Sequence, residues 1–200
     1  MTVVANPVEG GTVTGEGTYY HGATATLMAT ANTSYTFINW TNNGTVVSTN
    51  PTYSFTVTED ASYVANFELN RHTITATANP IEGGTVIGIG TYNQGATATL
   101  MAAANTGYAF IKWTKDGIVV STNPTYSFIV TEDVELVANF KLPGDANGDG
   151  IVDALDIVII VNHIFGLPTE VFIFDNADVN GDGVVDALDI VIIVNIIFSK

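Results

Sequence analysis

The segment Asp145-Ala146-Asn147-Gly148-Asp149-Gly150-Ile151-Val152-Asp153-Ala154-Leu155-Asp156 recurs further along the chain as Asp178-Val179-Asn180-Gly181-Asp182-Gly183-Val184-Val185-Asp186-Ala187-Leu188-Asp189. Each segment has Asp or Asn at positions 1, 3, 5, 9 and 12, and Gly at position 6. Oxygen ligands at this spacing, with the backbone carbonyl of position 7, wrap one Ca²⁺ ion, and the glycine permits the sharp turn. We therefore predict two calcium ions. The expected ligands are Asp145, Asn147, Asp149, Ile151, Asp153 and Asp156 in the first loop and Asp178, Asn180, Asp182, Val184, Asp186 and Asp189 in the second.

The residues around these loops differ from those of an EF-hand. Position 12 is Asp156 or Asp189, where an EF-hand usually has Glu. Because Asp is shorter, the loop must close more tightly to keep this ligand bidentate. The segments before the loops, Lys141-Leu142-Pro143-Gly144 and Asp175-Asn176-Ala177, indicate a linker and a turn rather than a preceding helix. Each unit is therefore predicted to be a loop followed by one helix.

Two such loop–helix units in close succession resemble a type I dockerin, over residues 144–198. The resemblance implies calcium-dependent folding and tight binding to a cohesin domain on another protein. It also implies that loop positions 10 and 11 contact the cohesin. Family members often carry a basic pair one turn further along the helix, where this chain has Val-Asn, and this difference leaves the cohesin type open. The expected partner-binding residues are Ala154, Leu155, Val158, Val161, Asn162, Ala187, Leu188, Val191, Val194 and Asn195.

The predicted helices favour a partner independently of the family. The segment Ile157–Phe165 is apolar on nearly every face, and a helix of this kind is normally buried. A unit as short as residues 143–200 is too small to cover two such helices, so apolar surface is expected to remain exposed, as at an interface. The partner is a cohesin, the neighbouring β-domain or another copy of this chain. Since both helices share Ala-Leu-Asp-Ile-Val-Ile-Ile-Val-Asn, we also hypothesise two near-equivalent docking orientations, related by a half-turn.

The rest of the chain contains two copies of a longer unit, which align without a gap when Thr2 is placed on Thr75. Of the 68 positions from Thr2 to Leu69, 49 are identical in the second copy. Apolar and Thr residues alternate, as in Ala23–Ala29, and turn residues separate the runs, which predicts about five or six short strands and no helix in each copy. The predicted fold is therefore multidomain. It has all-β domains at residues 1–71 (the first repeat) and 72–142 (the second repeat), then an all-α pair of calcium loop–helix units at residues 143–200 (the C-terminal module).

Both repeats contain the motif Asn-Pro-x-Glu-Gly-Gly-Thr-Val, followed by Gly-Ala-Thr-Ala-Thr-Leu, Tyr-x-Phe-Ile-x-Trp and Val-Ala-Asn-Phe. This pattern resembles the divergent internalin-B-type B-repeat over residues 1–142. The resemblance implies a small β-grasp-like unit of bacterial surface and secreted proteins. It further implies a spacer or adhesion role, an extracellular or cell-surface location, and no catalytic residues.

The charge of the chain is strongly negative, with 20 Asp and Glu, 5 Lys and Arg, and a formal net charge of −15. This surplus argues against nucleic-acid binding and against docking on anionic membranes. The absence of Cys excludes disulfides, thiolate nucleophiles and zinc–cysteine sites. The longest apolar stretches, Ile157–Val161 and Ile190–Val194, are far shorter than a membrane helix, and no signal peptide follows Met1. Because Met1 aligns with Ile74 at the repeat boundary, we expect the chain to be the C-terminal end of a longer protein.

No residue pattern indicates catalysis. The three histidines have no paired nucleophile, and neither Gly-x-Ser-x-Gly nor His-Glu-x-x-His occurs. Trp40 and Trp113 could stack on sugars, but each shares the apolar face of its strand, so a place in the core is predicted. We therefore predict a non-enzymatic, calcium-dependent anchor with the repeats as spacers. The alternatives are an extracellular adhesin, whose repeats bind a host or matrix ligand and whose C-terminal module is a calcium-stabilised cap, and a carbohydrate-binding module, which needs an exposed aromatic row.

Overall fold

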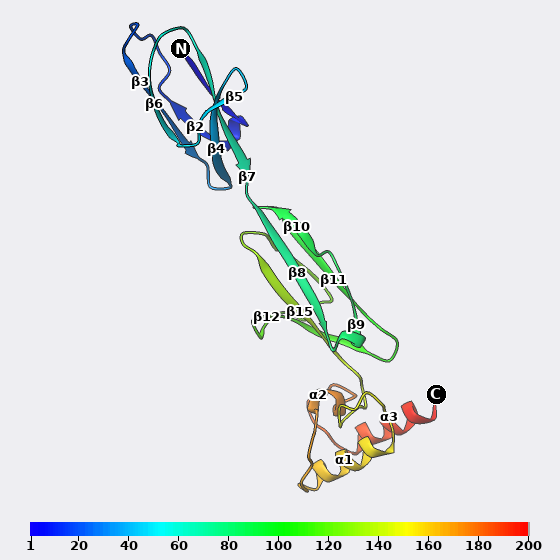
Figure 1. The fold of residues 1–200 in the computed structure, drawn as a ribbon. Coiled ribbons are helices and arrows are strands. Elements are labelled where there is room, and N and C mark those ends of the chain that lie inside the picture. Colours follow the sequence, from blue (N-terminus) through cyan, green and yellow to red (C-terminus); the bar gives the residue numbers. More distant parts are fainter. Residues whose placement is uncertain (200) are drawn as a thin grey trace. The chain divides into compact units, whose positions relative to one another are not determined.

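The computed structural model describes residues 1–199 and divides into two compact units. One unit contains Met1–His72, Thr91–Thr97 and Ile129–Asp133, and the other contains Thr73–Gly90, Ala98–Phe128 and Val134–Lys200. This division falls inside the second repeat, so the three domain boundaries expected from the sequence stay predictions. The coarser prediction of a β-rich region followed by a small helical region is confirmed (Figure 1).

The first repeat consists of two sheets. Its elements are β1 (Thr2–Asn6), the 3-10 turn η1 (Val8–Gly10), β2 (Gly11–Thr14), β3 (Thr24–Ala31), β4 (Tyr35–Asn42), β5 (Thr45–Ser48), β6 (Thr52–Thr56) and β7 (Ser62–Leu69). One sheet has the order β1-β7-β4-β5 and the other the order β2-β3-β6. Strand β1 runs parallel to β7, with Val3 beside Tyr63, whereas the other pairings in this repeat are antiparallel.

The second repeat has the same plan with one additional strand. Its elements are β8 (Arg71–Asn79), the 3-10 turn η2 (Ile81–Gly83), β9 (Gly84–Ile87), β10 (Gly90–Asn93), β11 (Thr97–Ala104), β12 (Ala109–Lys115), β13 (Ile118–Ser121), β14 (Thr125–Ile129) and β15 (Val134–Lys141). The sheets have the orders β10-β8-β15-β12-β13 and β14-β11-β9. Both repeats therefore hold more strands than expected, because several strands are very short and show little alternation.

Each repeat has its core around a tryptophan. Trp40 and Trp113 are both 0% exposed, which confirms their predicted place in the core. The Trp40 ring lies 5.8 Å from that of Phe37, and its Nε1–H donates to the carbonyl of Pro51 at 3.1 Å. A buried indole needs such an acceptor for its polar group. These side chains are consequently structural and form no exposed aromatic row.

The Gly-Gly pair of the repeat motif allows close packing as well as a turn. A Cβ atom at Gly10 would lie 2.6 Å from Cβ of Phe67, and one at Gly83 would lie 2.7 Å from Cβ of Phe140. Real Cβ atoms do not approach so closely, so a larger residue would displace the phenylalanine. The glycine therefore lets the 3-10 turn lie directly on the core aromatic ring.

The C-terminal module contains α1 (Ala154–Ile164), α2 (Phe174–Ala177) and α3 (Ala187–Phe198). The short helix α2 occupies the place where the sequence indicated a turn, directly before the second loop. No helix within residues 1–199 is long and apolar enough to cross a membrane. The buried apolar residues of the module are few, namely Ala146, Val152, Ile160, Ala177, Val185 and Ile193.

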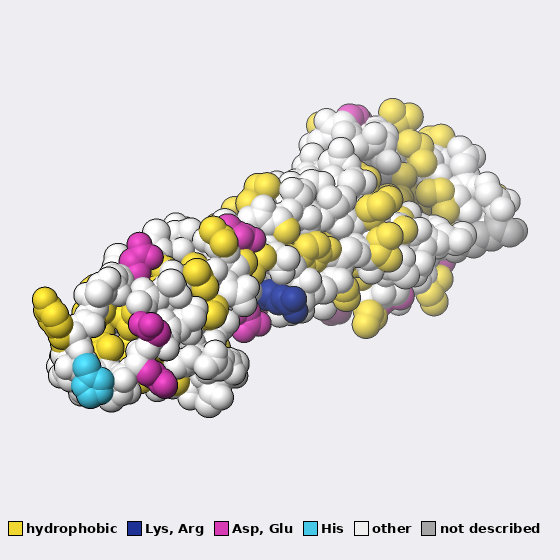
Figure 2. Space-filling model, turned by 90° about the horizontal axis from the view of Figure 1, so that it is seen from above, with side chains coloured by type: hydrophobic (Ala, Val, Ile, Leu, Met, Phe, Trp, Pro, Cys, Tyr) yellow, Lys and Arg dark blue, Asp and Glu magenta, His cyan; other side chains and the backbone are white. Residues whose placement is uncertain are grey.

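The surface reflects the negative charge of the sequence. On the face shown in Figure 2, acidic side chains are spread singly, and Lys or Arg is visible at one place. Most of the remaining surface on this face is uncharged, in line with the low charged fraction of 12%.

Candidate metal centre and partner surface

The first twelve-residue loop is organised around Asp145. Its Oδ1 accepts hydrogen bonds from the backbone N–H groups of Gly148 at 2.8 Å and Asp149 at 3.1 Å. Its Oδ2 accepts one from the N–H of Gly150 at 3.1 Å. Gly148 and Gly150 have positive φ angles of 74° and 85°, a conformation that glycine adopts without strain. The loop thus turns tightly around the first predicted ligand.

The predicted ligands at positions 3 and 5 bond to each other. The side-chain oxygen of Asn147 accepts from the N–H of Asp149 at 2.9 Å, and its Nδ2 donates to Oδ2 of Asp149 at 2.8 Å. Oδ1 of Asp149 in turn accepts from the N–H of Ile151 at 2.8 Å. The loop therefore brings these side chains together, and Ile151 takes part through its N–H group.

The predicted ligands at positions 9 and 12 begin helix α1. The side chain of Asp153 accepts from the N–H of Leu155 at 2.7 Å. It also accepts from the backbone N–H of Asp156, while the Asp156 side chain accepts from the N–H of Asp153 at 2.9 Å, and these two reciprocal bonds form a capping box. The second oxygen of Asp156 accepts from the N–H of Asn147 at 3.1 Å. Asp156 therefore connects the start of the helix to the start of the loop.

The second loop repeats all of these contacts at the aligned residues. The carboxylate of Asp178 accepts from the N–H groups of Gly181 at 2.8 Å, Asp182 at 3.2 Å and Gly183 at 2.9 Å. Asn180 donates to Asp182, whose carboxylate also accepts from the N–H of Val184 at 2.9 Å. Asp189 accepts from the N–H groups of Asn180 at 3.2 Å and Asp186 at 3.0 Å. Asp186 caps α3 as Asp153 caps α1. The two loops are therefore built alike.

Two carboxylates in each loop are buried. Asp145 and Asp156 are 4% and 0% exposed, and Asp178 and Asp189 are 7% and 0% exposed. Burial raises the pKa of Asp145 and of Asp156, because it disfavours their charged form. The nearby negative charge of Asp149 also raises the pKa of both carboxyl groups. Within residues 1–199 none of the four has an ion-pair partner.

The donor chemistry of each loop fits calcium. All the predicted ligands offer oxygen atoms, which Ca²⁺ prefers, and the buried charges of Asp145 and Asp156 call for a cation. In the described part of the chain, however, no cluster of three or more His, Asp or Glu side chains is placed to hold a metal ion. The carboxylates bond to backbone N–H groups instead. The individual ligand assignments therefore stay predictions.

The predicted partner-binding residues are largely on the surface of α1 and α3. Leu155 and Val158 are 51% and 52% exposed, and their counterparts Leu188 and Val191 are 54% and 55% exposed. Ala154, Ala187 and Asn195 are also exposed, whereas Val161, Asn162 and Val194 are half-buried. The two helices thus present matching apolar residues to solvent.

Two exposed aromatic residues extend this surface and were missed from the sequence. Phe165, directly after the last residue of α1, is 75% exposed, and Phe198, the last residue of α3, is 84% exposed. Each lies seven residues after an exposed valine, Val158 or Val191, and a spacing of seven keeps side chains on one face of a helix. This spacing, together with the recurrence of Phe at the same place in both units, was the signal in the sequence that could have placed these residues on the partner surface.

Comparison with known protein families gives two matches. The model of the divergent InlB B-repeat domain matches residues 1–71 and 74–143, and that of the type I dockerin domain matches residues 143–198. No curated protein matches the chain. Type I dockerins typically bind calcium and cohesin domains, and both families are typical of extracellular or surface bacterial proteins and are non-catalytic. The chain therefore belongs to the divergent InlB B-repeat family, with two B-repeat domains followed by a type I dockerin domain.

Proposed function

We propose that the C-terminal module is a calcium-dependent anchor that binds a cohesin-type domain of another protein, and that the two B-repeats are spacer or adhesion modules. The observation that carries this proposal is the pair of fully buried carboxylates, Asp156 and Asp189, each at the junction of a loop and an exposed apolar helix. A buried charge of this kind is stable only with a compensating partner. Calcium supplies that compensation and ties the loop to the helix.

Each loop is proposed to hold one ion. The ligands in each loop would be the side chains at positions 1, 3, 5, 9 and 12 and the carbonyl at position 7, as assigned from the sequence. Bound calcium supplies positive charge to these oxygens. The chain contributes the orientation of the ligands, because backbone N–H groups already hold the carboxylates of Asp145 and Asp178 in place.

The proposed cohesin-binding surface consists of the exposed residues of α1 and α3. Leu155 and Val158 on α1 and Leu188 and Val191 on α3 expose about half of their surface, although leucine and valine are normally buried. Such residues, repeated in the same positions, are typical of an interface. With Val and Asn in place of a basic pair, we propose a mainly apolar contact whose affinity depends little on salt.

The remaining expectations belong to the same proposal. The repeats would be β-grasp-like units of residues 1–71 and 72–142, and the protein would be a non-catalytic part of an extracellular or cell-surface bacterial protein. The burial of Trp40 and Trp113, whose Nε1–H groups donate to the carbonyls of Pro51 and Pro124, supports a spacer role over a carbohydrate-binding one.

Binding of the full chain to a panel of purified cohesin domains, with calcium and with chelator, tests the anchor. We expect binding to at least one cohesin in calcium and none in chelator. A matched control is Val4→Ala, which changes an exposed valine of β1 far in sequence from both helices. Failure to bind any cohesin while helices α1 and α3 remain folded in calcium would overturn the anchor and favour the adhesin with a calcium-stabilised cap.

The two proposed docking orientations need separate variants. Leu155→Ala and Leu188→Ala change one helix each, and the double variant changes both. We expect each single variant to retain cohesin binding through the unchanged helix and the double variant to lose it. If either single variant abolished binding, the hypothesis of two equivalent orientations would be wrong, although a single cohesin site would still stand.

A further inference from the structure

The chain contains three Asn-Gly pairs, which the fold places in different surroundings. They are Asn43-Gly44 between β4 and β5, Asn147-Gly148 in the first twelve-residue loop and Asn180-Gly181 in the second. An asparagine before a glycine can lose its side-chain amide, because the backbone nitrogen of the glycine is unhindered and can attack Cγ of the asparagine. The contacts of each pair decide whether the attack occurs in the folded protein.

The first pair forms an open turn. Asn43 and Gly44 connect β4 to β5, and Asn42 pairs with Thr45 directly across them. Their φ angles are 49° and 78°, as in the hairpin turn for which Asn-Gly is the preferred sequence. Both residues are exposed, and a Cβ atom at Gly44 would have nothing within 4 Å. The turn therefore has room for the rotation that brings the glycine nitrogen to the side chain.

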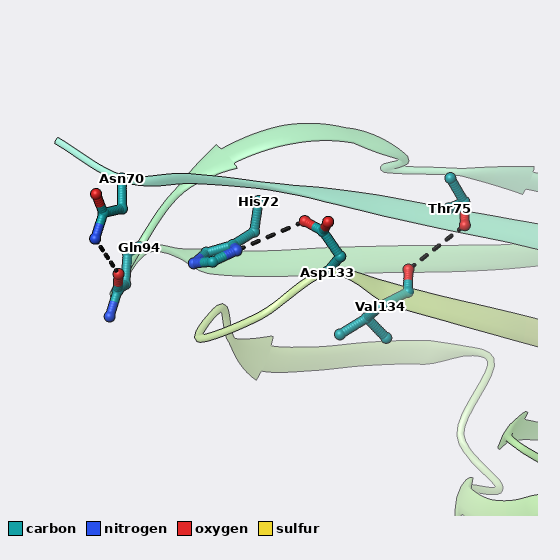
Figure 3. A network of polar contacts seen from close by, with 6 residues as sticks. All are labelled: Asn70, His72, Thr75, Gln94, Asp133 and Val134. Carbon is teal, nitrogen blue, oxygen red and sulfur yellow. Dashed lines mark hydrogen bonds and ion pairs between the residues drawn. The ribbon is translucent and has the colours of Figure 1, made fainter. Parts of the chain in front are cut away.

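Neither reacting group of this turn is held by a hydrogen bond. Within residues 1–199, the Asn43 side chain and the N–H of Gly44 have no partner. The amide of Asn70 shows the opposite case. Its oxygen accepts from Oγ1 of Thr36 at 2.7 Å, and its nitrogen donates to Oε1 of Gln94 at 3.1 Å (Figure 3). The Asn43 amide has no such restraint on its orientation.

The pairs in the twelve-residue loops are held at both reacting groups. The N–H of Gly148 donates to Oδ1 of Asp145 at 2.8 Å. The Asn147 side chain accepts from the N–H of Asp149 at 2.9 Å and donates to its carboxylate at 2.8 Å. The second loop repeats these bonds at the aligned residues. Hydrogen bonds to a charged acceptor are the strong ones, so in both loops the glycine nitrogen is withheld from the asparagine.

The second repeat shows that the turn accommodates an aspartate. Asp116-Gly117 occupies the position that aligns with Asn43-Gly44, and its φ angles are 51° and 78°. Both residues are exposed. The backbone of the turn is therefore nearly the same with a carboxylate as with an amide, so the folded first repeat can tolerate the change from Asn to Asp.

We propose that Asn43 is a site of spontaneous deamidation, which the fold favours over the other two Asn-Gly pairs. The backbone nitrogen of Gly44 gives its proton to solvent and attacks Cγ of Asn43. The new N–Cγ bond closes a cyclic imide, and the side-chain nitrogen leaves as ammonia. Water then opens the imide, at Cγ to give aspartate or at the backbone carbonyl to give isoaspartate. Water is the only co-reactant, so this proposal does not depend on calcium or cohesin binding.

The two products should affect the hairpin differently. Aspartate adds a negative charge and should preserve the pairing of β4 with β5, as Asp116 does in the second repeat. Isoaspartate lengthens the backbone by one carbon atom and cannot form the same turn, so the pairing of Asn42 with Thr45 should weaken. Strand β5 is at the edge of its sheet and pairs with β4 alone. The isoaspartate product should therefore loosen β5.

Incubation of the full chain in mildly alkaline buffer with calcium, followed by peptide mass spectrometry, tests the site. We expect Asn43 to be converted at least about tenfold faster than Asn147 or Asn180, the factor that corresponds to one hydrogen bond to a charged acceptor. In the chain unfolded by urea, all three should react at similar rates, because each precedes a glycine. Equal conversion of the three in the folded chain, or no conversion of Asn43, would overturn the proposal.

Two variants show whether the turn is the cause. Asp116→Asn creates an Asn-Gly pair in the aligned turn of the second repeat, and we expect it to be deamidated at a rate similar to that of Asn43. Asn43→Asp should remove the fast phase of ammonia release. Asn50 is an internal unreactive reference, because the Pro51 that follows it has no N–H to lose. If the Asp116→Asn variant were not deamidated at this position while Asn43 reacted, the assigned role of the turn would be wrong.

Discussion

The B-repeats and the C-terminal module bury different kinds of side chain. The largest fully buried side chains of the repeats are all apolar and include Trp40, Trp113 and Leu100. In the C-terminal module, those that are fully buried are Ile160 and Ile193 together with the carboxylates Asp156 and Asp189. The hydrophobic effect can stabilise the repeats without any partner. The module has a small core and buried charge, so its stability should depend on a cation.

Removal of calcium should show the largest difference in stability between the two regions. With chelator we expect the helical signal of α1 and α3 to be lost, because one ion at a thousandfold excess over its Kd contributes about 4 kcal/mol to folding. The repeats should be unchanged. Far-UV circular dichroism measures the helices, and tryptophan fluorescence measures the repeats alone, since both tryptophans lie there. A change in tryptophan emission on chelation, or no change in the helical signal, would contradict this difference.

Truncation of a core tryptophan should destabilise its repeat and leave the C-terminal module unchanged. We expect Trp40→Ala to lower the free energy of unfolding of the first repeat by about 3–5 kcal/mol, as is typical for a buried aromatic residue. Urea unfolding followed by circular dichroism measures this change. Trp113→Ala is the matched variant and should cost a similar amount in the second repeat, because its indole donates to Pro124 as that of Trp40 does to Pro51. Neither should alter the calcium dependence of the helices.

Neutralisation of one buried carboxylate should sharpen the comparison further. We expect Asp156→Asn to destabilise the C-terminal module by about 2 kcal/mol in calcium, because a charged hydrogen-bonding group and a proposed ligand are lost. In chelator, where the helices are already expected to be lost, the variant should cause no further change in the helical signal.

The control for Asp156→Asn is Asp175→Asn, in an exposed position of α2 outside both loops. It should have little effect with calcium or with chelator. Calorimetry of calcium binding should also show that Asp156→Asn lowers the calcium affinity of the first loop and leaves the affinity of the second loop unchanged. An equal loss of stability with and without calcium would mean that Asp156 acts only as a helix cap.

Local patterns were sufficient for much of this molecule. The twelve-residue loops were predicted because their key residues are close in sequence, and the structure brings Asp145, Asn147 and Asp149 into contact. The core positions of Trp40 and Trp113 followed from alternation along a single strand. In each case the physical cause acts within a few residues, so one segment of sequence contains the whole signal.

Features that depend on distant residues were not predicted. The parallel pairing of β1 with β7 joins residues far apart in the sequence, such as Val3 and Tyr63, and alternation gives the buried face of a strand but not its neighbour. The packing of Gly10 on Phe67 is similarly non-local, so no pattern near the Gly-Gly pair could predict it. The exposure of Phe165 and Phe198 depends on where the small core ends, which the apolar composition of the helices conceals.

The smallest expected effect concerns the exposed face of the three-stranded sheets. Oγ1 of Thr26 lies 2.8 Å from Oγ of Ser54 across β3 and β6, and the same pair recurs as Thr99 and Ser127 at 2.8 Å. We expect Thr26→Ala to cost about 0.5 kcal/mol, as is usual for a cross-strand pair on a solvated face. Thr99→Ala should cost the same, measured by urea unfolding. A loss as large as that of Trp40→Ala would show that the threonine face, and not the tryptophan core, dominates the stability of the repeats.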